Sequence, residues 1–328
     1  MTGDIETGNL QRKIDLQGKI VTVLGGTGFF GKHLAQELLA RGARLRIASR
    51  NPERAYRLKP LGNLGQTALT RCDVTRPETL ASALAGSDAV INLVGAFNGD
   101  LDAVQGEGAG RIAKAARKAG AKAFVHVSAI GADAESPIDY ARTKAEGENA
   151  VRAAFPNATI LRPSLLFGPD DNFVMMFAGL IQSMPALPVF GPDAGLQPVF
   201  IDDAAEAAAT AISQPGKHGG RVYELGGPEV LTMLELNQRI AKAQHRKRSF
   251  IALPDTIGGG IAALTGWLPG APITTDQFEL LKAGSVVSGT LPGFEDMGIA
   301  PKPLGLFLDR WMVRFRKHGR FGVQPSPQ

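Results

Sequence analysis

The chain has very little cysteine, with Cys72 the single one among 328 residues. One thiol excludes an intramolecular disulfide and a thiolate metal cluster, and it is typical of a protein from a reducing compartment. The five histidines are scattered and lack the spacing of metal ligands. We therefore predict no metal site.

Long uninterrupted apolar runs are also missing. The two longest uncharged stretches, 172–192 and 256–275, are each broken by prolines and glycines, which argues against a membrane-spanning helix. The first 19 residues contain three acidic residues and no apolar core typical of a secretory signal. The sequence therefore predicts a cytoplasmic location.

Basic residues outnumber acidic residues only slightly. The formal net charge is +5, which is too small to indicate a nucleic-acid-binding protein. The basic residues gather late in the chain, at 246–248 and between 310 and 320. Because no aromatic residues interleave with the first group, we predict no nucleic-acid partner.

What the chain does have is a regular alternation of short apolar runs and longer helical patterns from Lys19 onward. This alternation indicates βαβ units on a parallel sheet, with strands expected at 20–24, 44–48, 67–72, 89–94, 123–128 and 159–162. The prediction is an α/β fold with a Rossmann doubly wound parallel sheet and a smaller C-terminal α/β lobe.

The alternation loosens after Gly168, where prolines and glycines accumulate. We predict four regions: an N-terminal tail at 1–18, a Rossmann NAD(P)-binding core at 19–168, a smaller lobe interleaved with the core at 169–250, and a segment at 251–328. The last region would face an interface or a membrane and end in an amphipathic basic tail.

Residues 21–31 have the pattern of a buried strand that enters a glycine turn and then a helix. Gly25, Gly28 and Gly31 recur at every third position. The early glycines would let a pyrophosphate approach the amides at the positive helix end, and the last would let the helix pack closely on the strand. A plain turn is the alternative. The predicted dinucleotide-binding residues here are Gly25, Thr27, Gly28, Phe29, Phe30 and Gly31.

The second expected strand ends without the acidic residue that NAD-binding proteins place there. Arg50 follows instead, and its planar fork suits a ribose phosphate, with Ser49 and Arg54 nearby as further donors. This favours NADPH, with NAD less favoured, although both arginines would also suit a solvated surface loop.

Two further strand ends complete the expected cofactor site. Asp73 and Val74 follow the third strand and would lie at the adenine end. Leu93, Val94 and Gly95 close the fourth strand and would lie against the ribose and nicotinamide.

Six motifs follow one another between about residues 19 and 225: GGTGFFG, CDV, INLVG, YARTK, LRPSLLFGPDD and VFIDDAAEA. Together they resemble the extended short-chain dehydrogenase/reductase superfamily, which includes NAD-dependent epimerases and dehydratases. The resemblance implies that Lys144 binds the nicotinamide ribose and lowers the pKa of Tyr140, an acid/base in active members. It also implies cofactor contacts from Ser128, Pro163, Ser164 and Leu165.

The chain departs from that superfamily after the fifth strand. Ala129 stands where a Ser or Thr would hold the substrate oxygen, and Tyr140 follows only eleven positions later. Ser128 or Ser136 could supply a hydroxyl, but independent turnover is not expected. Tyr140 and Lys144 would then serve cofactor binding alone.

The C-terminal third, with LPGFEDMGI at 291–299, narrows the resemblance. It resembles the accessory subunit of respiratory complex I, the NADH:ubiquinone oxidoreductase alpha subcomplex subunit nine family, with its bacterial relatives. That resemblance implies a structural NADPH and contact with complex I core subunits near the quinone site. The location implied is the cytoplasmic face of a bacterial inner membrane, or the matrix side in a mitochondrion.

The late basic residues alternate with Trp311, Phe315 and Phe321, and 257–268 adds apolar surface. This composition suits anionic lipid headgroups or an acidic protein groove. The alternative is a helix that packs inward, with Met312 in the core.

Three functions stay open from sequence. The first is a non-catalytic, NADPH-binding accessory or assembly subunit of respiratory complex I. The second is a soluble NADPH-dependent short-chain reductase or nucleotide-sugar epimerase that uses Tyr140 and Lys144. The third is a sensor that binds NADPH and signals redox state without turnover.

Overall fold

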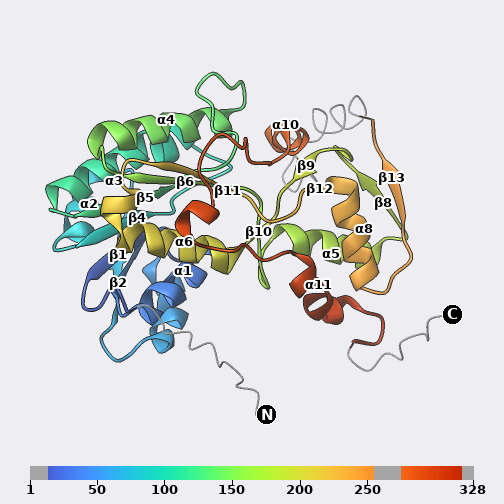
Figure 1. Cartoon of the computed structure of the whole chain (residues 1–328), viewed down its shortest axis with the longest axis horizontal. Coiled ribbons are helices and arrows are strands. Elements are labelled where there is room, and N and C mark those ends of the chain that lie inside the picture. Colours follow the sequence, from blue (N-terminus) through green and yellow to red (C-terminus); the bar gives the residue numbers. More distant parts are fainter. Residues whose placement is uncertain (1–13, 255–274, 320–328) are drawn as a thin grey trace, which may run out of the picture.

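A seven-stranded sheet forms the larger part of the molecule, and a smaller lobe lies beside it (Figure 1). The computed structural model describes residues 14–254 and 275–319. The strands of the sheet are β1 (Ile20–Leu24), β2 (Arg44–Ser49), β3 (Thr67–Arg71), β4 (Ala89–Asn92), β5 (Ala123–Val127), β6 (Thr159–Pro163) and β11 (Val222–Leu225). All pairs are parallel, in the order β11-β6-β5-β4-β1-β2-β3. The predicted α/β fold is confirmed, and each expected strand ends within two residues of its predicted bounds.

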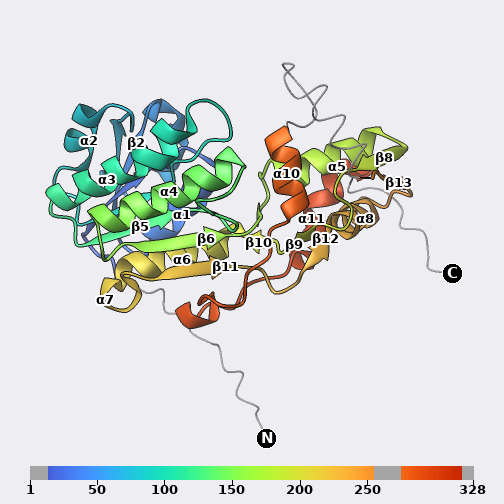
Figure 2. The same cartoon turned by 90° about the horizontal axis from the view of Figure 1, so that it is seen from above.

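Helices cover both faces of this sheet (Figure 2). On one face lie α1 (Phe29–Ala40) and α6 (Ile201–Ser213); on the other lie α2 (Pro77–Leu84), α3 (Glu107–Lys118) and α4 (Asp139–Ala154). The strands are apolar on both sides because each side is buried: Val21 and Val23 of β1 belong to the α1 and α6 core, whereas Leu24 belongs to the opposite one. The other helical segments of this part of the chain are η1 (Pro52–Leu61), η2 (Asp102–Gly106) and α7 (Pro215–His218).

The smaller lobe is also α/β and is built from chain segments that alternate with segments of the sheet. After β6 the chain enters the lobe, and it returns twice to the sheet region, for α6 and for β11. The elements of the lobe and the final segments are β7 (Leu166–Phe167), α5 (Phe173–Ser183), β8 (Ala186–Val189), β9 (Gly195–Leu196), β10 (Val199–Phe200), β12 (Leu231–Thr232), α8 (Met233–Ala243), β13 (Ser249–Ala252), α10 (Thr275–Ala283), η3 (Glu295–Met297), α11 (Gly305–Met312) and η4 (Val313–Phe315). The predicted smaller C-terminal lobe is confirmed.

The last described helix, α11, packs against the core of the smaller lobe. Met312 is fully buried, Trp311 stacks on Phe307, and Phe307 stacks on Phe200 with ring centroids 4.1 Å apart. These contacts favour the inward-packing alternative over a tail whose Trp311 faces lipid. Residues 257–268 and Phe321 lie outside the described residues.

The predicted N-terminal tail at 1–18 is in part packed against the rest of the chain, as its described residues from 14 onward show. Leu16 is fully buried, and its amide donates to the carbonyl of Arg41, so the segment before β1 packs on the end of α1. Within residues 14–254 and 275–319, no helix is long and apolar enough to cross a membrane.

The contact between Gly31 and Gly26 sets how closely α1 can pack against the turn after β1. A Cβ at Gly31 would overlap the backbone of Gly26, which no side-chain rotation can relieve. We expect Gly31→Ala to lower the free energy of unfolding by about 1–3 kcal/mol through overpacking. Chemical denaturation of the cofactor-free protein measures this change.

Gly179→Ala is the matched control, because Gly179 also lies in a helix but a Cβ there meets nothing within 4 Å. This substitution should stabilise the fold by about 0.5–1 kcal/mol through helix propensity. Equal effects of the two substitutions would contradict the close-packing argument.

Candidate functional site

The carboxyl ends of β1 and β4 form the centre of the candidate site. These strands are neighbours although three helices and two strands separate them along the chain, so the direction of strand order reverses between them. Such a switch point is where ligands bind in open parallel sheets. Gly25 lies at this switch point, directly after β1, and has a φ of +76°. A Cβ at this position would lie 3.1 Å from the carbonyl carbon of Leu93. Only glycine suits this position without strain.

The glycine turn leads into α1, and the N-terminal end of this helix is not capped by a side chain. Gly28 is the N-cap residue, and no side chain caps the helix. A Cβ at Gly28 would meet only the carbonyl oxygen of Gly25, at 3.5 Å, so the space above the first turn is open. Thr27, Phe29 and Phe30 lie partly exposed around it. Uncapped amides at the positive end of a helix dipole are suited to a phosphate group.

The predicted phosphate-selecting residues lie at the end of β2. Arg50 and Arg54 are exposed, and neither guanidinium has a hydrogen-bond or ion-pair partner within the described part of the chain. The Ser49 hydroxyl is buried and equally without a partner there. A buried hydroxyl without a partner is costly, so a ligand oxygen is a natural partner for it.

At the end of β3, Asp73 accepts hydrogen bonds from the amide and the hydroxyl of Thr75, at 3.0 and 2.8 Å. These bonds, with the positive charges of Arg50 and Arg76, hold the pKa of the Asp73 carboxyl below its usual range. Val74 beside it is buried. Asp73 therefore carries a negative charge within the influence of Arg50 and fixes the loop at the expected adenine end.

Lys144 of α4 lies buried at the ends of β4 and β5. Its Nζ donates to the carbonyl of Val127 at 3.4 Å, and a Cβ at Gly95 would come within 3.1 Å of it. Burial lowers the pKa of Lys144 to about 8. The Ser128 hydroxyl at the end of β5 is buried without a partner in the described chain. Gly95 thus leaves room for the ammonium beside a free hydroxyl, an arrangement suited to ribose oxygens.

Tyr140 shares the helix face of Lys144, but it is engaged differently from the arrangement that the resemblance implies. Its ring stacks on Phe97, with centroids 4.7 Å apart and 9° between planes. The Lys144 Nζ lies 5.8 Å from the centre of the Tyr140 ring, in a cation–π contact. Burial raises the pKa of Tyr140 to about 12. The resemblance implies a lowered pKa for Tyr140, whereas burial in this structure shifts it in the opposite direction.

The three residues expected after β6 lie at the same edge of the sheet. Pro163 and Ser164 are buried, and Leu165 is partly exposed. The Ser164 hydroxyl donates to the backbone carbonyl of Ser285 at 2.6 Å, so it already ties the sheet to the later segment.

Sequence reasoning missed the residues that support this site. Gln105, in the π-helical turn η2, accepts from the Ala96 amide and donates to the Thr143 hydroxyl, which fixes the loop after β4 against α4. Glu148 is fully buried and forms a two-point ion pair with Arg162 of β6 at 2.8 Å for each contact. A π turn has no sequence signature, but the four-residue spacing of Lys144 and Glu148 on one helix face was readable.

A buried histidine that sequence reasoning missed lies beside Asn92, where β4 and β5 run next to each other. His126 is completely buried, its Nδ1 lies 3.1 Å from the amide nitrogen of Asn92, and its Nε2 has no partner in the described chain. Burial and the charge of Lys144 lower the pKa of His126 to about 3, so the ring is neutral at physiological pH. The Nε2 atom of His126 and the Ser128 hydroxyl are therefore two buried polar groups that have no hydrogen-bond partner among the described residues.

These features together fit a dinucleotide. The glycine turn provides open space at an uncapped helix end, and the buried hydroxyls of Ser49 and Ser128, on either side of it, have no partner among the described residues. Residues of the glycine turn would hold the pyrophosphate, and Lys144 the ribose nearest the reactive ring.

Comparison with known proteins supports this assignment. A family model described as NAD(P)H-binding matches residues 25–175. The Citrobacter sp. triphenylmethane reductase, solved as a complex with NADP(H), has the same fold, with a TM-score of 0.71 at 23% identity over 89% of this chain and 99% of that chain.

Two mitochondrial proteins are similar along most of the chain. Both are named NADH dehydrogenase (ubiquinone) 1 alpha subcomplex subunit 9. The Arabidopsis thaliana protein is 30% identical over 341 residues, covering 97% of this chain and 85% of its own length. The Rattus norvegicus protein is 33% identical over 299 residues, covering 89% of this chain and 79% of its own length. The chain is therefore an NAD(P)H-binding protein and belongs to the family of NADH dehydrogenase (ubiquinone) 1 alpha subcomplex subunit 9.

Proposed function

We propose that the chain holds NADPH as a non-catalytic accessory or assembly subunit of respiratory complex I. The observation that carries the proposal is the state of Tyr140. Proton transfer near neutral pH requires an acid/base whose pKa is close to that pH. The pKa of Tyr140 is instead raised to about 12, and its ring is stacked on Phe97.

The residues around Tyr140 favour holding a cofactor over turning it over. Ala129 offers no hydroxyl for a substrate oxygen at the position that active superfamily members use. Bound NADPH supplies hydride-donating chemistry to an enzyme that can also position a substrate. In this chain Lys144 and Ser128 would bind and orient the nicotinamide ribose, while the glycine turn would bind the pyrophosphate.

The choice of NADPH over NADH rests on the end of β2. Arg50 carries an unpaired guanidinium within the described chain, and the Ser49 hydroxyl beside it is buried without a partner. Together they present donors to a ribose phosphate, and the carboxylate that would favour an unphosphorylated ribose is missing from positions 49–51.

Partners and location follow from the family. The relatives from Arabidopsis thaliana and Rattus norvegicus are named as subunits of mitochondrial NADH dehydrogenase. We propose that this chain contacts core subunits of the same enzyme near the quinone site. It would associate peripherally with the cytoplasmic face of a bacterial inner membrane, or with the matrix side in a mitochondrion, where its basic surface could contact anionic lipid.

A second candidate is an NADPH-dependent short-chain reductase or nucleotide-sugar epimerase. One observation favours it: the buried hydroxyl of Ser128, which has no partner in the described part of the chain, lies next to Ala129 at the end of β5, where a substrate oxygen would be bound. Ser128 would then replace the missing hydroxyl, and Lys144 and Tyr140 would act on the proton.

Purification distinguishes the two functions. We expect tagged protein from membranes to carry subunits of NADH:quinone oxidoreductase with it, and to release NADPH or NADP on denaturation without added nucleotide. Turnover of a carbonyl or nucleotide-sugar substrate with NADPH, abolished by Tyr140→Phe, would contradict the accessory role. Soluble recovery without any of those subunits would also count against it.

Cofactor selection has its own test in Arg50→Ala. A charge-assisted contact to phosphate contributes about 1.5–3 kcal/mol, so NADPH should bind about ten- to a hundredfold more weakly while NADH binding changes little. Titration calorimetry with both nucleotides measures the difference. Arg57→Ala removes the same charge from η1 and should leave both affinities unchanged; equal losses for NADPH and NADH in Arg50→Ala would refute phosphate selection.

Lys144 gives a pH-dependent prediction. Its folded pKa of about 8 lies below its ordinary value of 10.5, so above about pH 8 the unfolded chain binds more protons than the folded chain. The free energy of unfolding therefore rises with pH between these values, and Lys144→Met should remove that part of the rise.

Denaturation of cofactor-free protein at about pH 7 and about pH 10 tests this sign. Wild type should gain stability relative to Lys144→Met as the pH increases. Lys114→Met, at an exposed position of α3, should follow the wild type. If the wild type instead loses stability relative to Lys144→Met as the pH rises, the pKa of Lys144 is not lowered by burial in the folded state.

A further inference from the structure

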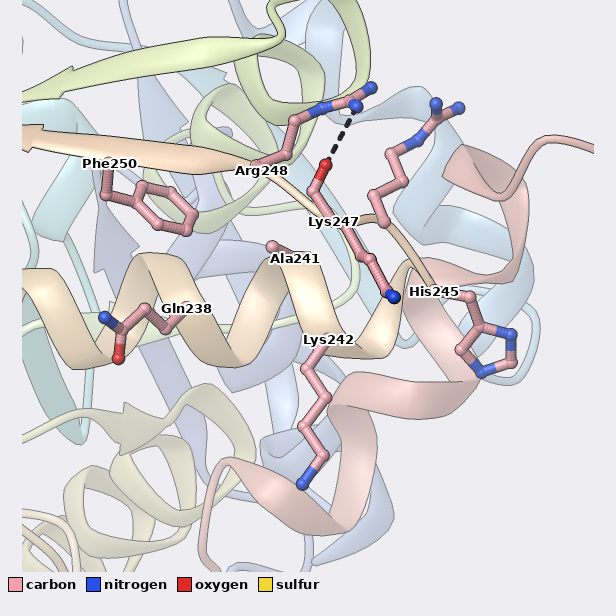
Figure 3. A pocket seen from close by; sticks show the side chains of 8 residues that line it. Gln238, Ala241, Lys242, His245, Lys247, Arg248 and Phe250 are labelled. Atoms are coloured by element: carbon pink, nitrogen blue, oxygen red, sulfur yellow. Dashed lines mark hydrogen bonds between the residues drawn. The ribbon is translucent and has the colours of Figure 1, made fainter. Parts of the chain in front are cut away.

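The smaller lobe carries a basic hollow of about 740 Å³ where α8 ends and β13 begins. Figure 3 shows the hollow between the last turns of α8 and the strand β13. The residues that line it are Gln238, Ala241, Lys242, His245, Arg246, Lys247, Arg248 and Phe250. Four of these eight side chains carry a positive charge, and none carries a negative one.

Two arginines of the hollow are held rigidly by backbone carbonyls. Arg246 donates through Nε and Nη2 to the carbonyl of Phe315, at 3.2 and 2.9 Å. Arg248 donates through Nε to the carbonyl of Ile181 at 2.8 Å. Because carbonyl oxygens are neutral, these bonds fix the guanidinium groups without cancelling their charge.

The two lysines of the hollow are exposed and unpaired. Neither the Lys242 nor the Lys247 ammonium has a hydrogen-bond or ion-pair partner in the described segments of the chain. Lys242 lies in the last turn of α8, where a cation interacts favourably with the helix dipole. The dipole does not explain Lys247, which lies beyond the helix.

His245 points to a ligand independently of the charges. It has φ +57°, the one non-glycine residue with a positive φ in the described chain. The His245 amide donates to the carbonyl of Lys242, and the Arg246 amide donates to that of Ala241. This is the helix-ending pattern that favours glycine at the position of His245. Histidine enters the left-handed region more readily than most residues, but glycine is the usual residue at this position, so the His245 side chain is a candidate for a functional role.

We propose that this hollow binds a phosphomonoester whose organic group is apolar. The unpaired ammonium groups of Lys242 and Lys247 and the imidazole of His245 would bind the phosphate, inside the positive field of the fixed arginines. Ala241 and the half-buried ring of Phe250 would contact the apolar group. The source is either a lipid headgroup or a free organic phosphate.

This site is separate from the dinucleotide site. It is built from α8, β13 and the loop between them in the smaller lobe, whereas the dinucleotide residues lie at the ends of β1 to β6. The test therefore uses full-length protein saturated with NADPH, so that phosphate probes compete only for the hollow. Failure here would leave the assignment of the dinucleotide site unchanged.

Two probes identify the source. Phenyl phosphate is titrated calorimetrically, and vesicles of phosphatidylcholine with and without phosphatidic acid are used in sedimentation. Binding of phenyl phosphate indicates a free organic phosphate, whereas binding only to vesicles with phosphatidic acid indicates a lipid headgroup. Binding of neither probe overturns the proposal.

Substitutions then test whether the probe binds in the hollow. Lys242→Ala/Lys247→Ala should weaken binding by about tenfold or more, as expected for lost charge-assisted contacts. Lys114→Ala/Lys118→Ala removes the same charge from α3 and should bind as wild type does. Equal losses in the two double variants, or full binding by Lys242→Ala/Lys247→Ala, overturn the site.

His245→Gly distinguishes a role of the imidazole in binding from a role in folding. Glycine relieves the left-handed backbone at this position, so Tm should stay the same or rise while probe affinity falls. A variant that binds as tightly as wild type would show that the imidazole takes no part.

Discussion

The close approach of Gly31 to the backbone of Gly26 is the contact on which the rest of the candidate site depends. It brings the first turn of α1 directly against the turn after β1, with Gly25 beside the end of β4. The helix amides and the strand ends consequently meet at one edge, where the strand order reverses. A bulkier residue would separate the positive helix end from the groups that bind the remainder of a dinucleotide.

Burial of Lys144 is the second constraint on the candidate site. An ammonium out of water is costly, and its lowered pKa expresses that cost. Glu148 and Arg162 hold α4, the helix that carries Lys144, against β6 through a buried ion pair. The same desolvation raises the pKa of Tyr140. Burial therefore shifts the pKa values of both residues, lowering that of Lys144 and raising that of Tyr140.

The two lobes are joined by alternation of the chain as well as by contact. β11 completes the sheet after the chain has already built much of the smaller lobe, and Phe200, just before α6, stacks on Phe307 of α11. Ser164 is tied to Ser285 across the same junction. The smaller lobe is therefore anchored at several points to the edge of the sheet that carries the candidate cofactor site.

Local patterns in the sequence determined the strands, the glycine turn and the basic end of β2, because these depend on side-chain periodicity and on residues without a Cβ. Sequence alone also determined the family, through motifs spread along the chain. Only the tertiary structure decided the direction of the Tyr140 pKa shift and the support from Gln105, since pKa values follow burial and a π turn has no sequence signature. It also turned Trp311 inward and placed Arg246, Lys247 and Arg248 with Lys242 around one hollow, because packing between distant segments decides which side chains reach solvent.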